Sequence, residues 1–159
     1  MKKITNRVLL GAMLVVGLIL ISGCSQNQNN PANPDAPSSV VTMFKSPTCG
    51  CCGVYAQYMK RDGFSVDVKD VNNMDKIKKD YNIPANLQSC HTTKVGDYFV
   101  EGHVPVEAIE KLMSEKPDIA GIALPGMPQG SPGMPGNKNQ QWIIYSINRD
   151  GSYGEFMRI

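Results

Sequence analysis

Residues 49–52, with the sequence CGCC, constrain the fold of this chain more than any other feature. They stand where a strand pattern gives way to a helix pattern. Before them, residues 40–44 (VVTMF) form a short β-prone run that is typical of a buried strand. After them, apolar residues recur at helical spacing up to Gly63, a common residue at the end of a helix. The sequence therefore predicts a strand–helix unit with three cysteines at the N-terminus of its helix.

The patterns that follow predict one small α/β domain over residues 40–159. The predicted order is β-α-β-α-β-β-α and then a terminal hairpin, which describes a mixed sheet with flanking helices. Residues 117–141 are rich in proline and glycine, which predicts a long irregular loop that contains Met127 and Met134. The other expected elements are strands at 64–71, 142–147 and 153–157, a hairpin at 92–100, and helices at 74–81 and 105–114.

Cys49 and Cys52 have the C-x-x-C spacing of thioredoxin-like redox sites, and the predicted α/β order around them agrees with a thioredoxin-like fold. A helix N-terminus presents free N–H groups and a partial positive charge, which favours thiolate over thiol. Cys51 adds a third sulfur, whereas a disulfide uses only two. The third sulfur therefore argues for a metal site, and the alternative is one disulfide beside a spare thiol.

The first 39 residues are predicted to lie outside the folded domain. Three basic residues precede an apolar run over residues 8–21, which is the pattern of a secretory signal and is short for a permanent membrane span. The run ends in ISGC, which resembles the lipobox of bacterial lipoproteins and implies a signal peptide over residues 1–23 and a lipid on Cys24. Residues 24–39 are then a lipidated cysteine and a disordered tether, because they hold no large aliphatic side chain. An uncleaved anchor helix is the alternative.

Removal of this signal peptide would change the formal net charge from +2 to −1, because it contains Lys2, Lys3 and Arg7. The remaining chain has no basic stripe and no basic patch with interleaved aromatic residues, which argues against a nucleic-acid partner. Four cysteines besides Cys24 would face an oxidising compartment, where thiols form disulfides unless a metal or a reductant holds them.

A second group of candidate ligands comes from two further motifs. Cys90 and His91 precede the predicted hairpin, and His103 precedes the helix that follows it. In a thioredoxin-like topology the loop before the third strand faces the C-x-x-C helix terminus, so Cys90 and His91 are expected to close over the other cysteines. His91 is the stronger candidate because it adjoins a cysteine, whereas His103 fits a structural role equally well. The Val104–Pro105 bond could also be a cis peptide that shapes the site.

Four thiolates with one or two imidazoles suit copper(I), zinc or an iron–sulfur cluster. Zinc fingers favour two separate knuckles, and this chain has one compact knuckle. Iron–sulfur assembly is not expected on a chain that is exported unfolded. Copper(I) is therefore the expected metal, with several ions bridged by adjacent cysteines, and zinc is the alternative. The thioethers of Met127 and Met134 could add ligands or could only pack within their loop.

Four separate motifs stand out together: residues 46–52 (SPTCGCC), 89–92 (SCHT), 100–105 (VEGHVP) and 125–134 (PGMPQGSPGM). They resemble the CopG-type family of bacterial thioredoxin-like proteins, which was earlier known only as a domain of unknown function. The resemblance spans residues 40–159 and implies copper resistance in the cell envelope, copper-ion binding and copper redox chemistry. The candidate ligands that it carries over are Cys49, Cys51, Cys52, Cys90, His91 and His103.

We therefore expect a lipid-anchored protein of the bacterial cell envelope, facing the periplasm or the exterior, that binds copper and supports copper tolerance. Its expected partners are copper ions, the membrane and other envelope copper-handling proteins. We expect binding rather than catalysis. The alternatives are a thiol–disulfide oxidoreductase that uses Cys49 and Cys52, a copper oxidoreductase, and a zinc-binding or structural lipoprotein.

Overall fold

The computed structural model describes residues 40–159. The predicted signal peptide, Cys24 and the tether lie outside the described residues. Within residues 40–159, none of the helices has the length and apolar character needed to cross a membrane.

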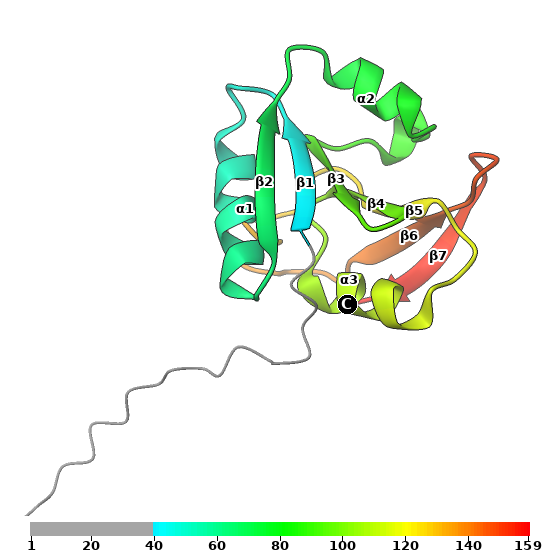
Figure 1. The fold of residues 1–159 in the computed structure, drawn as a ribbon. Coiled ribbons are helices and arrows are strands. Elements are labelled where there is room, and N and C mark those ends of the chain that lie inside the picture. The colour runs from blue at the N-terminus through cyan, green and yellow to red at the C-terminus, as the bar shows by residue number, and fades with distance from the viewer. Residues whose placement is uncertain (1–39) are drawn as a thin grey trace, which may run out of the picture. The chain divides into compact units, whose positions relative to one another are not determined.

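The described residues form a seven-stranded mixed sheet with the strand order β2-β1-β3-β4-β5-β6-β7 (Figure 1). The β1–β2 and β4–β5 pairs are parallel, and the other neighbours are antiparallel. The predicted mixed sheet with flanking helices and a C-terminal hairpin is thus confirmed. The strands are β1 (Val40–Lys45), β2 (Ser65–Asp70), β3 (His91–Val95), β4 (Tyr98–Gly102), β5 (Gly121–Leu124), β6 (Ile143–Ile147) and β7 (Tyr153–Arg158), and the helices are α1 (Gly50–Arg61), α2 (Met74–Asp80), the 3-10 turn η1 (Ala85–Leu87) and α3 (Val106–Glu115).

Helices α1 and α3 share one face of the sheet and form the larger core with it. A hydrogen bond of 2.9 Å joins the start of α3 to the last turns of α1, in which the backbone N–H of Val106 donates to the hydroxyl oxygen of Tyr58. Burial of apolar side chains on this face is the main stabilising contribution to the domain. The core includes Val41, Met43, Tyr55, Met59, Val100, Ile109, Leu112, Ile122 and Ile144.

A smaller core covers the other face of the sheet, beneath α2 and η1. Figure 1 shows α2 and α3 on opposite sides of the sheet, at the top and the bottom of the view. Phe99 and Val100 are adjacent in β4 but belong to the two different cores, as the alternation of side chains along a strand requires. The smaller core consists of Ile83, Leu87, Phe99, Ala123 and Ile147.

The structure corrects one part of the predicted topology. The region expected to be a single irregular loop, residues 117–141, contains the buried strand β5. A Cβ atom at Gly121 would lie 2.2 Å from the carbonyl oxygen of Phe99, so the glycine permits close contact with β4 and does not mark a loop. The irregular segment begins only after Leu124. The Val104–Pro105 peptide bond is trans.

The two edges of the sheet, β2 and β7, carry ion-paired side chains. On β2 the ammonium group of Lys69 lies 2.9 Å from the carboxylate of Asp67. On β7 the guanidinium group of Arg158 lies 2.5 Å from the carboxylate of Glu155. All four side chains are solvent-exposed, so each of these pairs adds little to the free energy of unfolding.

Candidate metal centre

The first turn of α1 carries three of the predicted ligands. Cys49 is the N-cap residue and its backbone N–H donates to the carbonyl oxygen of Ser46 at 3.0 Å. No side chain caps the helix and no acidic residue lies in its first turn. The free N–H groups and partial positive charge of this helix N-terminus are therefore not neutralised by a side chain of the first turn.

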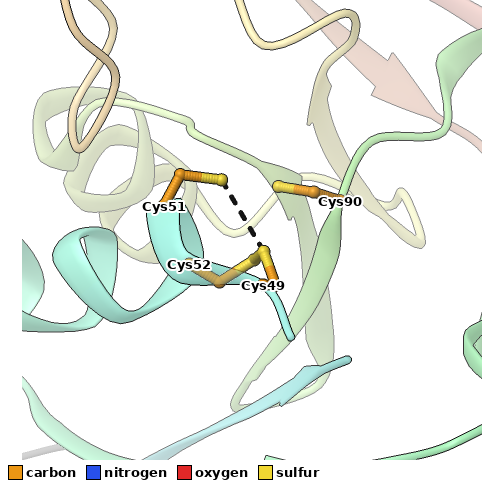
Figure 2. A group of neighbouring side chains, drawn as sticks. All are labelled: Cys49, Cys51, Cys52 and Cys90. Carbon is orange, nitrogen blue, oxygen red and sulfur yellow. Dashed lines mark hydrogen bonds between the residues drawn. A yellow bond between two sulfur atoms is a disulfide. The ribbon is translucent and has the colours of Figure 1, made fainter. Parts of the chain in front are cut away.

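Two of these cysteines are joined. Cys49 and Cys52 form a disulfide with a Cα–Cα distance of 5.5 Å, and the side chain of Cys52 is fully buried. Cys51 and Cys90 are the free cysteines of the described chain, and both are half-buried. The sulfur of Cys51 lies 3.6 Å from that of Cys49 (Figure 2). The structure therefore contains the disulfide that the sequence left as an alternative, beside two free thiols.

Cys90 reaches the cysteines of α1 from the segment before β3, as the sequence predicted. The sulfur atoms of Cys49, Cys51, Cys52 and Cys90 all lie within 4.8 Å of one another (Figure 2). Burial, followed by the nearby charge of Cys51, raises the pKa of the Cys90 thiol to about 12. In the metal-free protein Cys90 is consequently a neutral thiol, and a metal ion bound there would displace its proton.

Both histidines contact the sulfur of Cys90. His103 Nε2 lies 3.1 Å from it and His91 Nδ1 lies 3.3 Å from it. The ligand atoms of the three residues lie within 4.8 Å of one another. Cys90 therefore belongs to two groups of potential ligands at once, the four sulfurs and this sulfur–imidazole trio.

The imidazole of His103 is oriented by the Gly/Pro-rich loop. Its Nδ1 lies 2.6 Å from the carbonyl oxygen of Pro132, and this contact requires a proton on Nδ1. The Nε2 lone pair then points toward Cys90. Burial lowers the pKa of His103, so the ring is neutral at neutral pH. A backbone acceptor on the far nitrogen is the usual support of a metal-binding histidine.

His91 is fully buried, and Nε2 of its ring has no hydrogen-bond partner. Burial lowers the pKa of His91 well below its usual value, and the charges of His103 and Lys78 add to this effect. The ring is therefore neutral, as a metal ligand must be. A buried polar atom without a partner is uncommon in proteins and often marks a site that a ligand completes.

The ring of Tyr55 packs against both imidazoles. Its ring centre lies 4.7 Å from that of His91 and 5.2 Å from that of His103. Its hydroxyl donates to the carbonyl oxygen of Val104 at 2.6 Å, next to His103. The sequence assigned Tyr55 only to the apolar face of a helix. Its position beside the two histidines depends on contacts between distant segments and has no local sequence signal.

The Gly/Pro-rich loop lies against the first turn of α1. At Gly133, φ is +80°, and an added Cβ atom would lie 2.8 Å from the backbone nitrogen of Tyr55 and 3.2 Å from the carbonyl oxygen of Cys51. Met134 follows directly and is half-buried, whereas Met127 is 38% exposed. The loop thus meets the cysteine-bearing turn at Gly133, and the assignment of either methionine as a ligand stays a prediction.

The donor set suits a soft metal ion. It offers up to four sulfur atoms and two neutral imidazoles, which is the ligand chemistry of copper(I) and also of zinc. Two imidazole nitrogens face the sulfur of Cys90, Nδ1 of His91 at 3.3 Å and the oriented Nε2 of His103 at 3.1 Å, and both agree with this fit. The arrangement is compatible with metal binding, and the individual ligand assignments remain predictions.

A family model described as "Protein of unknown function, DUF411" matches residues 87–134, the segment from Leu87 through Met134 that includes Cys90, His91 and His103. No curated protein matches the chain. Two solved structures, "Copper resistance protein copG" in form 1 and form 2, are each 33% identical to this chain and cover 76% of it. The match covers 97% and 98% of their own chains, with a TM-score of 0.71 in both cases. This chain belongs to the CopG family of copper resistance proteins.

Proposed function

We propose that this chain is a copper-binding protein of the bacterial cell envelope, anchored by a lipid on Cys24, that holds copper through its cysteine–histidine cluster and thereby supports copper tolerance. The observation that carries the proposal is the position of Cys90, whose sulfur is shared by the four-sulfur group and the sulfur–imidazole trio. The copper resistance proteins to which the chain is similar favour copper over the other soft ions.

Copper is the cargo in this proposal. Four side chains can bind it without a prior redox step, namely the free cysteines Cys51 and Cys90 and the imidazoles of His91 and His103. The remaining pair, Cys49 and Cys52, donates as two thiolates only after a reductant has opened the disulfide. Sulfur and imidazole ligands favour copper(I), and adjacent cysteines can bridge more than one ion. We therefore expect a larger copper capacity in the reduced protein than in the oxidised protein.

Copper binding is tested on the full-length chain, loaded with copper(I) under anaerobic conditions and then desalted. Elemental analysis should find copper in the wild type and much less in Cys90→Ser. Cys24→Ser is the matched control, because Cys24 is a cysteine outside the described cluster. The proposal is wrong if Cys90→Ser retains as much copper as the wild type and the Cys24→Ser variant. Competition with zinc distinguishes copper from the zinc alternative.

The lipid anchor is tested by Cys24→Ala in a bacterial host. This variant should lose labelling by radioactive fatty acid and should no longer partition into detergent, while copper binding persists. Continued partitioning of the variant would mean that the apolar residues 8–21 remain attached and would contradict the lipobox interpretation. The motivation is the polar composition of residues 25–39, which separates anchor from domain.

A second candidate function, thiol–disulfide exchange, is favoured by the Cys49–Cys52 disulfide at the start of α1. Against it stands Cys51, whose sulfur lies 3.6 Å from Cys49 and offers a competing partner. Insulin reduction by the metal-free protein decides between the two functions. Catalysis at a rate comparable to that of thioredoxin, abolished in Cys49→Ser and retained in Cys51→Ser, would favour the enzyme.

A further inference from the structure

A buried ion pair lies on the face of the sheet opposite to the metal centre. Glu101 on β4 is fully buried, and its Oε1 lies 2.5 Å from the ammonium group of Lys78, which α2 supplies. Lys78 is itself buried, with 6% of its side chain exposed. The hydrogen bonds of Glu101 and Lys78 go to each other and to Ser89 and Thr92, and none goes to a cysteine or histidine side chain.

The carboxylate of Glu101 nevertheless holds the segment that bears Cys90 and His91. Its Oε1 accepts the backbone N–H of Ser89 at 2.5 Å, and its Oε2 accepts the hydroxyl of Thr92 at 2.6 Å. Ser89 and Thr92 are the residues on either side of the Cys90–His91 pair. One carboxylate thus fixes both ends of this four-residue segment, which begins before β3 and ends within it.

The same carboxylate lies two residues before His103 in the chain. Between them, Gly102 has a φ of +79°, and an added Cβ atom would lie 2.7 Å from the side chain of Ser89. The end of β4, which carries Glu101, is therefore in close contact with the segment that contains Ser89 and leads into Cys90. These two segments carry Cys90 and His103, whose Sγ and Nε2 atoms lie 3.1 Å apart.

Stability alone is a weak reason for a pair of this kind. A buried ion pair contributes about as much to the free energy of unfolding as an apolar pair of similar volume, and often less. An apolar pair, however, would leave the N–H of Ser89 and the hydroxyl of Thr92 without acceptors. What Glu101 supplies that no apolar residue can supply is two oxygen atoms aimed at the residues that flank Cys90 and His91.

We propose that Glu101, held in place by Lys78, is a positioning residue that sets the approach of Cys90 to His103 and His91 from behind the sheet. This inference rests on the proposed copper binding at those residues. Outer partners that orient metal ligands typically change metal affinity by about ten- to a hundredfold when they are removed. Loss of Glu101 should change copper affinity by a factor in this range. The residue acts through its hydrogen bonds to the backbone N–H of Ser89 and the hydroxyl of Thr92, without contact to the metal.

The test compares two double variants of the full-length protein that both remove the charge pair. Lys78→Met/Glu101→Gln keeps a carbonyl acceptor near Ser89, whereas Lys78→Met/Glu101→Leu keeps none. Copper(I) affinity is measured by competition with a chelator on folded protein. We expect the leucine variant to bind copper at least about tenfold more weakly than the wild type and the glutamine variant to remain within about threefold.

A second readout needs no metal. The chain has two histidines, so the imidazole resonances of the metal-free protein can be assigned with single histidine variants. The leucine variant should shift both rings relative to the wild type, while the glutamine variant should leave them close to it. Wild-type affinity and unchanged resonances in both double variants would overturn the proposal. Equal losses in both would assign the effect to charge and would overturn it as well.

If the leucine variant does not fold, Thr92→Val carries the test, because it removes one hydrogen bond to Glu101 and keeps the ion pair and the side-chain shape. A loss of about threefold or more in copper affinity, with shifted imidazole resonances, supports the positioning role. Wild-type values for both overturn it. A wild type that binds no copper would contradict the proposed function, whereas displaced histidine resonances in the metal-free variants would still support the positioning role.

Discussion

His103 Nε2 lies 3.1 Å from the sulfur of Cys90, although the two residues are thirteen positions apart in the sequence. The contact spans the β3–β4 hairpin and joins its two ends. On the other side of the imidazole, Nδ1 bonds to the carbonyl oxygen of Pro132, so the ring is fixed before any metal arrives. This preorganisation makes His103 the better-supported of the two imidazoles, and the first prediction follows from it.

His103→Ala should weaken copper(I) binding by about ten- to a hundredfold, and more than His91→Ala does. His103 has a backbone acceptor that orients its ring, whereas Nε2 of His91 has no partner. The sequence alone favoured the opposite order, because His91 adjoins Cys90. Chelator competition gives the two affinities, and circular dichroism confirms that both variants fold. A larger loss in His91→Ala would restore the order that the sequence favoured.

Reduction of the Cys49–Cys52 disulfide by a dithiol should increase the copper bound per chain, because it adds two thiolates to the donor set. In the oxidised protein, Cys51→Ser should lower copper binding more than Cys49→Ser, since Cys51 is free and Cys49 is not. Elemental analysis of both redox forms, with thiols counted in parallel, measures this. Equal copper in the oxidised and reduced wild type would exclude Cys49 and Cys52 as ligands.

Gly133→Ala should destabilise the domain by about 1–3 kcal/mol more than Gly126→Ala. Both glycines have positive φ, +80° and +76°, so the backbone penalty is shared. Only at Gly133 does a Cβ atom meet protein, 2.8 Å from the backbone nitrogen of Tyr55, whereas Gly126 faces open space. Urea denaturation of the metal-free variants gives the difference. Similar free energies of unfolding would mean that the loop does not pack on α1 as described.

Metal-free protein should be most stable between about pH 6.5 and 9. The pKa of His91 is lowered by burial, so below its ordinary value of 6.5 the unfolded chain binds a proton that the folded protein does not, and stability falls on acidification. The pKa of Cys90 is raised to about 12 from 9.0, so above about pH 9 the unfolded chain loses a proton that the folded protein keeps. Calorimetry across this range measures both slopes.

His91→Phe is the control for the acidic side, because it removes the titrating group and keeps an aromatic ring beside Tyr55. The free energy of unfolding of this variant should decrease much less than that of the wild type when the pH is lowered below 6.5. If the wild type and this variant respond alike to acid, the buried His91 does not govern the acidic slope.

Local patterns in the sequence predicted most of the elements around the site. The strand–helix junction at Cys49 and the hairpin turn at Gly96 lie where they were expected. Helix α2 begins at the expected residue, and the side chain of Asn73 caps it by accepting the backbone N–H of Lys76 at 3.0 Å. Each of these features depends on residues within about four positions of one another, which is the range over which propensity and capping act.

The features that the sequence did not reveal depend on distant partners. Strand β5 is stabilised by pairing with β4, and the glycine that permits this close approach was interpreted as a loop signal. The partner of His103 is a backbone carbonyl 29 residues away, at Pro132, and every residue has such a carbonyl. Lys78 and Glu101 are 23 residues apart and resemble ordinary surface charges. Only the three-dimensional arrangement distinguishes them.

The ion-paired strands β2 and β7 bear on how copies of this domain would meet one another. Strand edges are the places where two copies of a β-protein can join into one continuous sheet and then aggregate. Each edge of this sheet carries one acidic and one basic side chain, Asp67 with Lys69 on β2 and Glu155 with Arg158 on β7. Two edges could meet only if these charged groups lost their water, which costs free energy. If the proposed lipid anchor gathers copies on a membrane surface, the charged edges should keep the domains from joining into one sheet.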